Sequence, residues 1–144
     1  RSRFRLEFDF TGTADFTPFL CIPTALRFLA TLLPSGIAGL QAHNRELALA
    51  GREVLCRALG TTPPAPDSMI GSLASVILPD STAPMVPPHG LDPLQVRLWE
   101  QHRIEVPVMR WPQPKLRMLR ISPQIYNSLA QYEQLAAIVA ADCR

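Results

Sequence analysis

The chain has 144 residues, of which 47% are hydrophobic and 18% are charged, and its formal net charge is +2. This length and composition are typical of one soluble globular domain that buries a core without metal or disulfide support, and they exclude a disordered chain. The small net charge and the scattered arginines argue against nucleic acid and against an anionic membrane as partners. We also find no apolar run long enough to span a bilayer and no signal-peptide core.

The cysteines indicate the redox environment of the protein, and the scarcity of lysine limits the covalent chemistry that it can carry out. Cys21, Cys56 and Cys143 are far apart and odd in number, so neither a disulfide framework nor a metal site is predicted. We expect a reducing, cytoplasmic setting in which Cys21 and Cys56 are small buried apolar residues. Lys115 is the only lysine beside thirteen arginines, which matters because Schiff-base chemistry needs a lysine amine.

The N-terminal part predicts a strand followed by an apolar helix. Residues 3–10 alternate phenylalanine or leucine with charged residues, which is typical of a strand with one buried face. Turn-forming residues follow, and Thr17 with Pro18 marks the start of a helix that we expect to end near Leu33. Because this helix is apolar nearly all round, we expect it to be buried between layers, with Pro23 as a possible kink.

The middle of the chain predicts two helices with a strand between them. An amphipathic helix is expected over residues 37–59, with Gly60 as its C-cap. A proline-rich loop leads to a strand over residues 72–78. A second proline-rich loop then leads to a helix that begins at Asp92 and ends near His102, with Trp99 facing inward.

The C-terminal part predicts two more strands and a last helix. Residues 104–109 favour a strand in which Pro107 indicates an edge or a bulge. Residues 116–121 alternate again, with Leu116 and Met118 on the apolar side, Leu119 left open, and Arg117 and Arg120 on the other side. The last helix begins at Asn127-Ser128. The whole order is β-α-α-β-α-β-β-α, which predicts one α+β domain over residues 1–144, a small antiparallel sheet with helices packed on one face.

No complete catalytic constellation is found, so we assign no catalytic and no metal-binding residue. Two places could bind an anion. Gly12 and Thr13 lie in a turn before a helix, where backbone amides and a hydroxyl suit a phosphate, although a plain turn is the simpler interpretation. Arg120 ends a strand, where a guanidinium can bind a carboxylate through two hydrogen bonds, although a surface arginine is the simpler interpretation.

Three segments resemble one enzyme family. Residues 8–15 (Phe-Asp-Phe-Thr-Gly-Thr-Ala-Asp) resemble the strand-to-turn segment of class V aminotransferase-like proteins, especially the isopenicillin N epimerase-like branch. Residues 102–108 (His-Arg-Ile-Glu-Val-Pro-Val) look like the Ile-Glu-Val-Pro segment of that branch. Residues 119–127 (Leu-Arg-Ile-Ser-Pro-Gln-Ile-Tyr-Asn) look like its Arg-hydrophobic-Ser-x-Gln-x-Tyr-Asn signature, with Pro123 where a small residue is more usual. The segments occur in the family order and span nearly the whole chain.

The resemblance implies the C-terminal portion of a homodimeric, fold type I enzyme that uses pyridoxal 5'-phosphate. Residues 1–35 would then be the end of the large domain and a linking helix, and the partner would be the N-terminal cofactor-binding domain of the parent protein. By the same resemblance, Gly12 and Thr13 would reach the cofactor phosphate of the neighbouring subunit. Arg120 would hold the carboxylate of an amino-acid substrate.

The chain departs from the family in one respect, because it lacks two residues that the cofactor chemistry of the family requires. The family's Schiff-base lysine and the aspartate beside the pyridinium nitrogen lie upstream of this segment, and Lys115 does not match the lysine position. We therefore expect the chain to bind no cofactor covalently and to be inactive alone. Epimerisation, carbon–sulfur lysis and transamination all stay open as the reaction of the parent. The alternative is a catalytically dead interaction or dimerisation module that uses the apolar helix over residues 16–33.

Overall fold

A three-stranded antiparallel sheet lies at the centre of the fold, in the order β1-β3-β2. The structure is a computed structural model that describes residues 2–10, 12–81, 83–85, 90–111 and 116–143. Its elements, in chain order, are α1 (Arg3–Phe8), α2 (Thr17–Leu29), α3 (Gly36–Leu59), the 3-10 turn η1 (Asp67–Met69), β1 (Ala74–Leu78), α4 (Pro93–His102), β2 (Val108–Arg110), β3 (Arg117–Ile121) and α5 (Leu129–Asp142).

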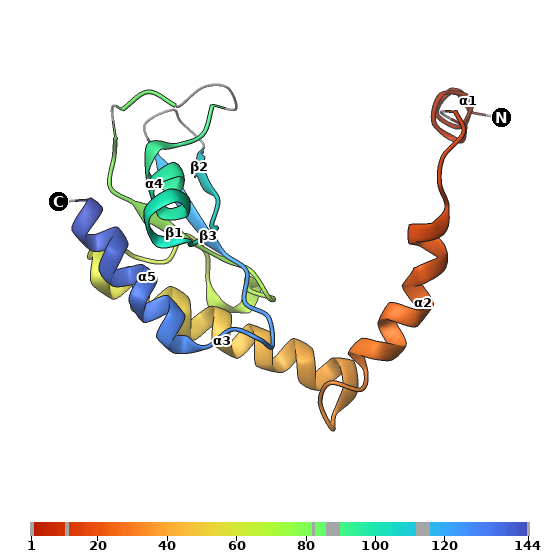
Figure 1. Cartoon of the computed structure of the whole chain (residues 1–144), viewed down its shortest axis with the longest axis horizontal. Helices are drawn as coiled ribbons and strands as arrows, with labels where there is room; N and C mark the ends of the chain where they lie inside the picture. Colours follow the sequence, from red (N-terminus) through yellow and green to blue (C-terminus); the bar gives the residue numbers. More distant parts are fainter. Residues whose placement is uncertain (1, 11, 82, 86–89, 112–115, 144) are drawn as a thin grey trace.

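One face of the sheet carries the hydrophobic core. Every second residue of β1 and of β3 is buried, and the register pairs Val76 with Leu119 at the centre of that face. Leu55 of α3, Leu98 of α4 and Val139 of α5 belong to the same buried cluster. Helices therefore pack against an antiparallel sheet (Figure 1), and the predicted α+β class is confirmed.

The predicted start of α4 and the predicted end of α3 are confirmed, and each is explained by a capping residue. The Asp92 carboxylate accepts a hydrogen bond of 3.0 Å from the Leu94 N–H and so caps α4 before Pro93. Helix α3 ends at Gly60, whose φ of 65° lies in the left-handed region that glycine tolerates best. The predicted strand over residues 104–109 is shorter and begins later, since β2 covers Val108–Arg110 directly after Pro107. Among the described residues β2 pairs with β3 alone, so it lies at the edge of the sheet that Pro107 indicated.

The predicted faces of β3 were wrong for two residues, although Leu119, which was left open, is buried. Arg117 is buried and Met118 is half-buried on the opposite face. An arginine can occupy this core position because its charge is paired: Arg117 Nη1 lies 3.0 Å from Asp92 Oδ1, and its Nε donates to the Pro79 carbonyl at 3.1 Å. Arg110 Nη2 lies 3.3 Å from the other Asp92 oxygen. A buried arginine–aspartate–arginine cluster thus joins β2, β3 and the start of α4.

The prediction for the N-terminal part was also wrong. Residues 3–8 form the short helix α1 instead of a strand, and α2 ends at Leu29 with Pro23 inside it. Neither helix has a buried residue, so the expected burial of α2 is not found. A strand with a two-residue period needs a neighbouring strand for its hydrogen bonds, and none lies beside residues 3–10 among the described residues. Local bonds form instead, including an Arg3–Glu7 ion pair of 2.7 Å one helical turn apart.

Residues 2–10 and 12–30 therefore form an arm that extends away from the sheet and its helices (Figure 1). Ten large apolar side chains of this arm are between 49% and 76% exposed; they are Phe4, Leu6, Phe8, Phe10, Phe16, Phe19, Leu20, Ile22, Leu26 and Phe28. We call these ten side chains the apolar arm surface. No described helix is both long enough and apolar enough to cross a membrane.

Two further predictions about burial were wrong. Trp99 is 52% exposed on α4, because Leu94 and Leu98 occupy the inward positions of that helix. Cys21 is exposed because it lies on α2, whereas Cys56 is buried as predicted. Burial raises the pKa of the Cys56 and Cys143 thiols above the ordinary value, which keeps both groups neutral at physiological pH.

Candidate functional site

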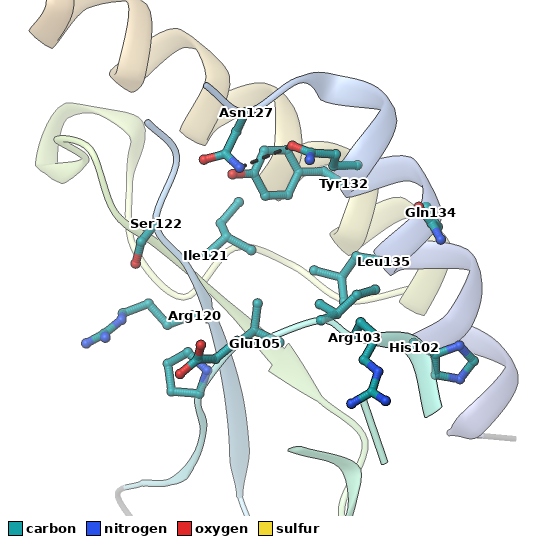
Figure 2. Close-up of a pocket in the computed structure, with 14 residues that line it drawn as sticks. His102, Arg103, Glu105, Arg120, Ile121, Ser122, Asn127, Tyr132, Gln134 and Leu135 are labelled. Atoms are coloured by element: carbon teal, nitrogen blue, oxygen red, sulfur yellow. Dashed lines mark hydrogen bonds between the residues drawn. The ribbon is translucent and has the colours of Figure 1, made fainter. Parts of the chain in front are cut away.

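Arg120 lies at one end of a pocket of about 400 Å³. Its backbone N–H donates to the Pro107 carbonyl at 3.1 Å, which holds the segment after α4 against β3. Helix α5 forms the other wall (Figure 2). The lining residues are His102, Arg103, Ile104, Glu105, Val106, Pro107, Arg120, Ile121, Ser122, Asn127, Gln131, Tyr132, Gln134 and Leu135. The three walls come from three segments of the C-terminal part of the chain, residues 102–107, residues 120–122 and residues 127–135.

The Arg120 side chain is half-buried and incompletely paired. Its Nε atom is buried and has no hydrogen-bond partner among the residues that the structure describes. A buried donor without an acceptor is costly, and a ligand oxygen could supply the missing acceptor. The predicted position of this arginine at the end of a strand is confirmed, since β3 ends at Ile121. Its geometry suits a carboxylate, which accepts two parallel hydrogen bonds from a guanidinium.

The pocket wall opposite β3 is neutral and in part apolar. Tyr132 and Leu135 of α5 are buried beside Ile121 of β3. Burial raises the pKa of the Tyr132 hydroxyl above its ordinary value, so this group stays protonated across the physiological range. The charged groups that line the pocket are therefore Arg103, Arg120 and Glu105, and the His102 imidazole also lines it.

The segment after Arg120 is held by a chain of amide side chains. The Gln124 side-chain oxygen accepts from Asn44 Nδ2 at 2.8 Å and from the Ile125 N–H at 2.9 Å. Asn127 Oδ1 accepts from the Gln124 N–H at 3.0 Å. Gln131 Oε1 accepts from the Ser128 N–H and so supports the start of α5. These bonds give the Gln and Asn of the late motif a structural role, since they fasten this turn to α3 and α5.

The sequence did not single out Asn44, although it anchors this turn. Asn44 is 4% exposed, lies on α3 and is 80 residues away from Gln124. Its Oδ1 atom has no hydrogen-bond partner within the described part of the chain. An asparagine on a helix gives no pattern that predicts such a contact. Tyr126 of the late motif, in contrast, is 81% exposed and contributes no core contact.

Gly12 and Thr13 lie on the arm between α1 and α2 and are not brought to the Arg120 pocket (Figure 1). Gly12 has a φ of 119°, a conformation that favours glycine, and a Cβ built on it would meet no atom within 4 Å. Thr13 is exposed. The backbone at this point is open, so amides and a hydroxyl are accessible to an anion that approaches the arm.

The neighbouring Asp15 limits how such an anion could bind. Its carboxylate accepts from the Thr17 N–H at 2.9 Å, at the start of α2. Hydrogen bonds from Thr17 hold the pKa of Asp15 below its ordinary value, so the group is ionised. Asp15 therefore takes one of the helix-terminal amides that a phosphate would use. Gly12 and Thr13 fit a phosphate only as a contribution to a site whose other groups come from elsewhere.

Two other predictions concern a metal site and the only lysine of the chain. No group of three or more histidine, cysteine, aspartate or glutamate residues that could hold a metal ion occurs in the described part of the chain. Lys115 lies outside the described residues, so its surroundings stay a matter of sequence alone.

Comparison with known proteins agrees with the three motifs. The chain is 35% identical over 127 residues to an isopenicillin N epimerase of Amycolatopsis lactamdurans, and 35% identical over 136 residues to one of Streptomyces clavuligerus. These alignments cover 87% and 92% of this chain but 29% and 30% of the two epimerases. A provisionally named L-cysteine desulfhydrase of Oryza sativa subsp. japonica is 26% identical over 152 residues, which covers 94% of this chain and 31% of the rice protein. No family model matches.

The chain thus spans about three-tenths of the length of the curated relatives it matches, at their C-terminal end. It is similar to the C-terminal part of class V aminotransferase-like, pyridoxal-phosphate-dependent enzymes, and the resemblance identified from residues 8–15, 102–108 and 119–127 is confirmed.

Proposed function

We propose that this chain is the C-terminal domain of a pyridoxal-phosphate-dependent enzyme that acts on an amino acid, and that Arg120 binds the substrate carboxylate. The observation that carries this proposal is the buried Nε of Arg120, which lacks an acceptor within the described part of the chain; Arg120 lines a pocket between β3 and α5. The similarity to two epimerases and a desulfhydrase supports the class of cofactor but leaves epimerisation, carbon–sulfur lysis and transamination open.

The remaining parts of the proposed site come from outside the pocket. Bound pyridoxal phosphate would supply an electron sink for bonds at the amino-acid α-carbon. Gly12 and Thr13 would donate hydrogen bonds to its phosphate, with Asp15 directing that anion away from the start of α2. The N-terminal cofactor-binding domain and a second subunit are the partners that this arrangement requires. A cytoplasmic location stays part of the proposal.

Carboxylate binding by Arg120 is tested on the chain itself. We expect butyrate to shift the backbone amide signals of β3 and of residues 102–107 in a ¹⁵N-edited titration, with a dissociation constant in the millimolar range. Arg120→Gln should weaken this binding about tenfold, because it removes one charge-assisted, two-point contact. Arg97→Gln is the matched control, since Arg97 is paired with Asp142 at 3.0 Å and does not line the pocket. If the unaltered chain and the Arg120→Gln variant bind butyrate equally well, Arg120 is not the carboxylate-binding residue.

The proposed lack of independent cofactor chemistry is tested by adding pyridoxal phosphate. We expect no stoichiometric covalent adduct after borohydride reduction, as measured by absorbance and intact mass, because Lys115 does not match the family position for the cofactor lysine. Lys115→Arg is the control for adventitious adducts. A stoichiometric adduct that disappears in this variant would show that the chain holds the cofactor by itself.

A second candidate function is a stand-alone, catalytically dead interaction or dimerisation module. The apolar arm surface favours it, since contiguous exposed apolar area is typical of a surface that another protein covers. The genomic sequence upstream of Arg1 separates the two functions. A reading frame with a lysine-bearing α/β domain supports the enzyme domain, whereas a start codon directly before Arg1 supports the module.

A further inference from the structure

Asn44 is a polar residue in the buried stripe of helix α3. The other buried residues of this helix are Leu40, Ala48, Gly51, Arg52, Leu55 and Cys56. Asn44 is 4% exposed, and a buried amide is costly unless both of its ends are hydrogen-bonded. Its Nδ2 donates to Gln124 Oε1 at 2.8 Å, but its Oδ1 is buried and has no partner among the residues that the structure describes. Stability alone would favour a leucine at this position, since leucine leaves no acceptor unpaired.

The orientation of the Asn44 amide is fixed by the residue that it contacts. Gln124 Oε1 also accepts from the Ile125 N–H at 2.9 Å, so the Gln124 side chain presents its oxygen to two donors. A Gln124 amide turned the other way would place its NH2 group against the Ile125 N–H, with donor facing donor. Asn44 must therefore offer its Nδ2 group to Gln124, and its unpaired Oδ1 is a consequence of that contact.

A chain of hydrogen bonds leads from Asn44 to the wall of the Arg120 pocket. The Gln124 N–H donates to Asn127 Oδ1 at 3.0 Å, and Asn127 Nδ2 donates to Gln131 Oε1 at 3.1 Å (Figure 2). Asn127 and Gln131 line the pocket, whereas Asn44 and Gln124 lie behind its lining residues. The contact between Asn44 and Gln124 therefore ties this wall of the pocket to α3.

We infer that Asn44 is a positioning residue for the binding of a carboxylate at Arg120. Asn44 holds Gln124, and Gln124 holds Asn127 at the pocket wall, so the pocket is formed before a ligand enters. A preformed site binds more tightly than one that is ordered on binding, because less conformational entropy is then lost. The unpaired Oδ1 of Asn44 is the loss of stability that accompanies this arrangement. The inference rests on the proposed function of Arg120 and adds to it a residue that acts through others.

Asn44→Leu tests this role, since leucine has the same branching of heavy atoms and no polar group. Gln124 Oε1 keeps the Ile125 N–H as a donor, so that oxygen does not become unpaired. We expect the urea midpoint of unfolding to stay unchanged or to rise. Butyrate should bind about fivefold more weakly in the ¹⁵N-edited titration. The amide hydrogens of Ile125 and Asn127 should exchange about tenfold faster, while those of β3 keep their rates.

Gln124→Met breaks the same contact from the other side, and it carries the test if Asn44→Leu does not fold. It should weaken butyrate binding at least as much as Asn44→Leu does. The two substitutions together should weaken binding no more than Gln124→Met alone, because both interrupt one chain of hydrogen bonds. A residue that only filled the core would give independent, additive effects on butyrate binding instead.

The outcomes separate this inference from the proposed function. If Asn44→Leu binds butyrate within about twofold of the unaltered chain, while Arg120→Gln weakens binding, the inference is wrong and the proposed function stands. The same conclusion follows if the urea midpoint of Asn44→Leu falls, since Asn44 would then act through stability. If the unaltered chain binds no butyrate through Arg120, both proposals fail.

Discussion

Asp92→Ala should lower the free energy of unfolding by about 3–5 kcal/mol, which is the largest effect that we expect from a single substitution. Asp92 is 2% exposed and contacts both Arg110 and Arg117. Its removal leaves the Arg117 charge in the core without a counter-ion, and it also removes the cap of α4. The measurement is urea unfolding followed by circular dichroism, with the slope of the transition compared between the two proteins.

Asp142→Ala provides the matched control for Asp92. Its carboxylate pairs with Arg97 near the surface, where an ion pair contributes about 0.2–1 kcal/mol. The two variants lose the same functional group, so the difference between them reports the effect of burial. Equal destabilisation by both would mean that the Arg110–Asp92–Arg117 cluster is open to water in solution, and the position of β3 against α4 would need revision.

Gly51→Val should destabilise the chain by about 2–3 kcal/mol through overpacking. Gly51 lies where α3 crosses α5, and a Cβ there would be 2.9 Å from Tyr132 Cγ and 3.0 Å from Ile121 Cδ1. Real Cβ atoms essentially never approach another atom that closely, so helix α5 has to move away from α3. Valine has a helix propensity only slightly better than that of glycine, which leaves the steric effect dominant. The measurement is the same unfolding experiment.

Two comparisons isolate the steric effect at Gly51. Gly71→Val is the control, because a Cβ at that position would meet nothing within 4 Å, and we expect a change within about 0.5 kcal/mol. Tyr132→Ala in the Gly51→Val background should remove the clash with the Tyr132 ring and leave the one with Ile121, so the two substitutions together should cost less than their sum. Strict additivity would show that the valine is accommodated without contact to Tyr132.

The parts of the fold that the sequence predicts well are those with a local cause. Asp92 with Pro93 defines the start of α4, and Gly60 defines the end of α3, because caps act within one turn of chain. The inward face of β3 failed because burial of Arg117 depends on Asp92, which is 25 residues away. The alternating pattern of residues 3–10 failed for the same reason, since a strand needs a neighbour that the described chain does not provide.

In the candidate site, too, residues with a local sequence signal were predicted and residues that depend on tertiary contacts were missed. Arg120 was predicted because it ends an alternating stretch, and the structure places it in a pocket. The roles of Gly12 and Thr13 stay a prediction from resemblance. Asn44 and Arg103 were missed because their contribution comes from tertiary contacts and from a left-handed backbone conformation that periodicity does not report.

The arm determines whether the phosphate-binding and carboxylate-binding parts of the proposed site are coupled in stability. Gly12 and Thr13 lie on an arm without buried side chains, whereas Arg120 lies in the middle strand of the sheet. Amide hydrogens of such an arm exchange with solvent through local opening, while those of β3 exchange only when the core unfolds. The phosphate-side and carboxylate-side contacts therefore belong to separate cooperative units. Only a surface that covers the arm would link their stabilities, so exchange protection of residues 16–29 would report the docking of that surface directly.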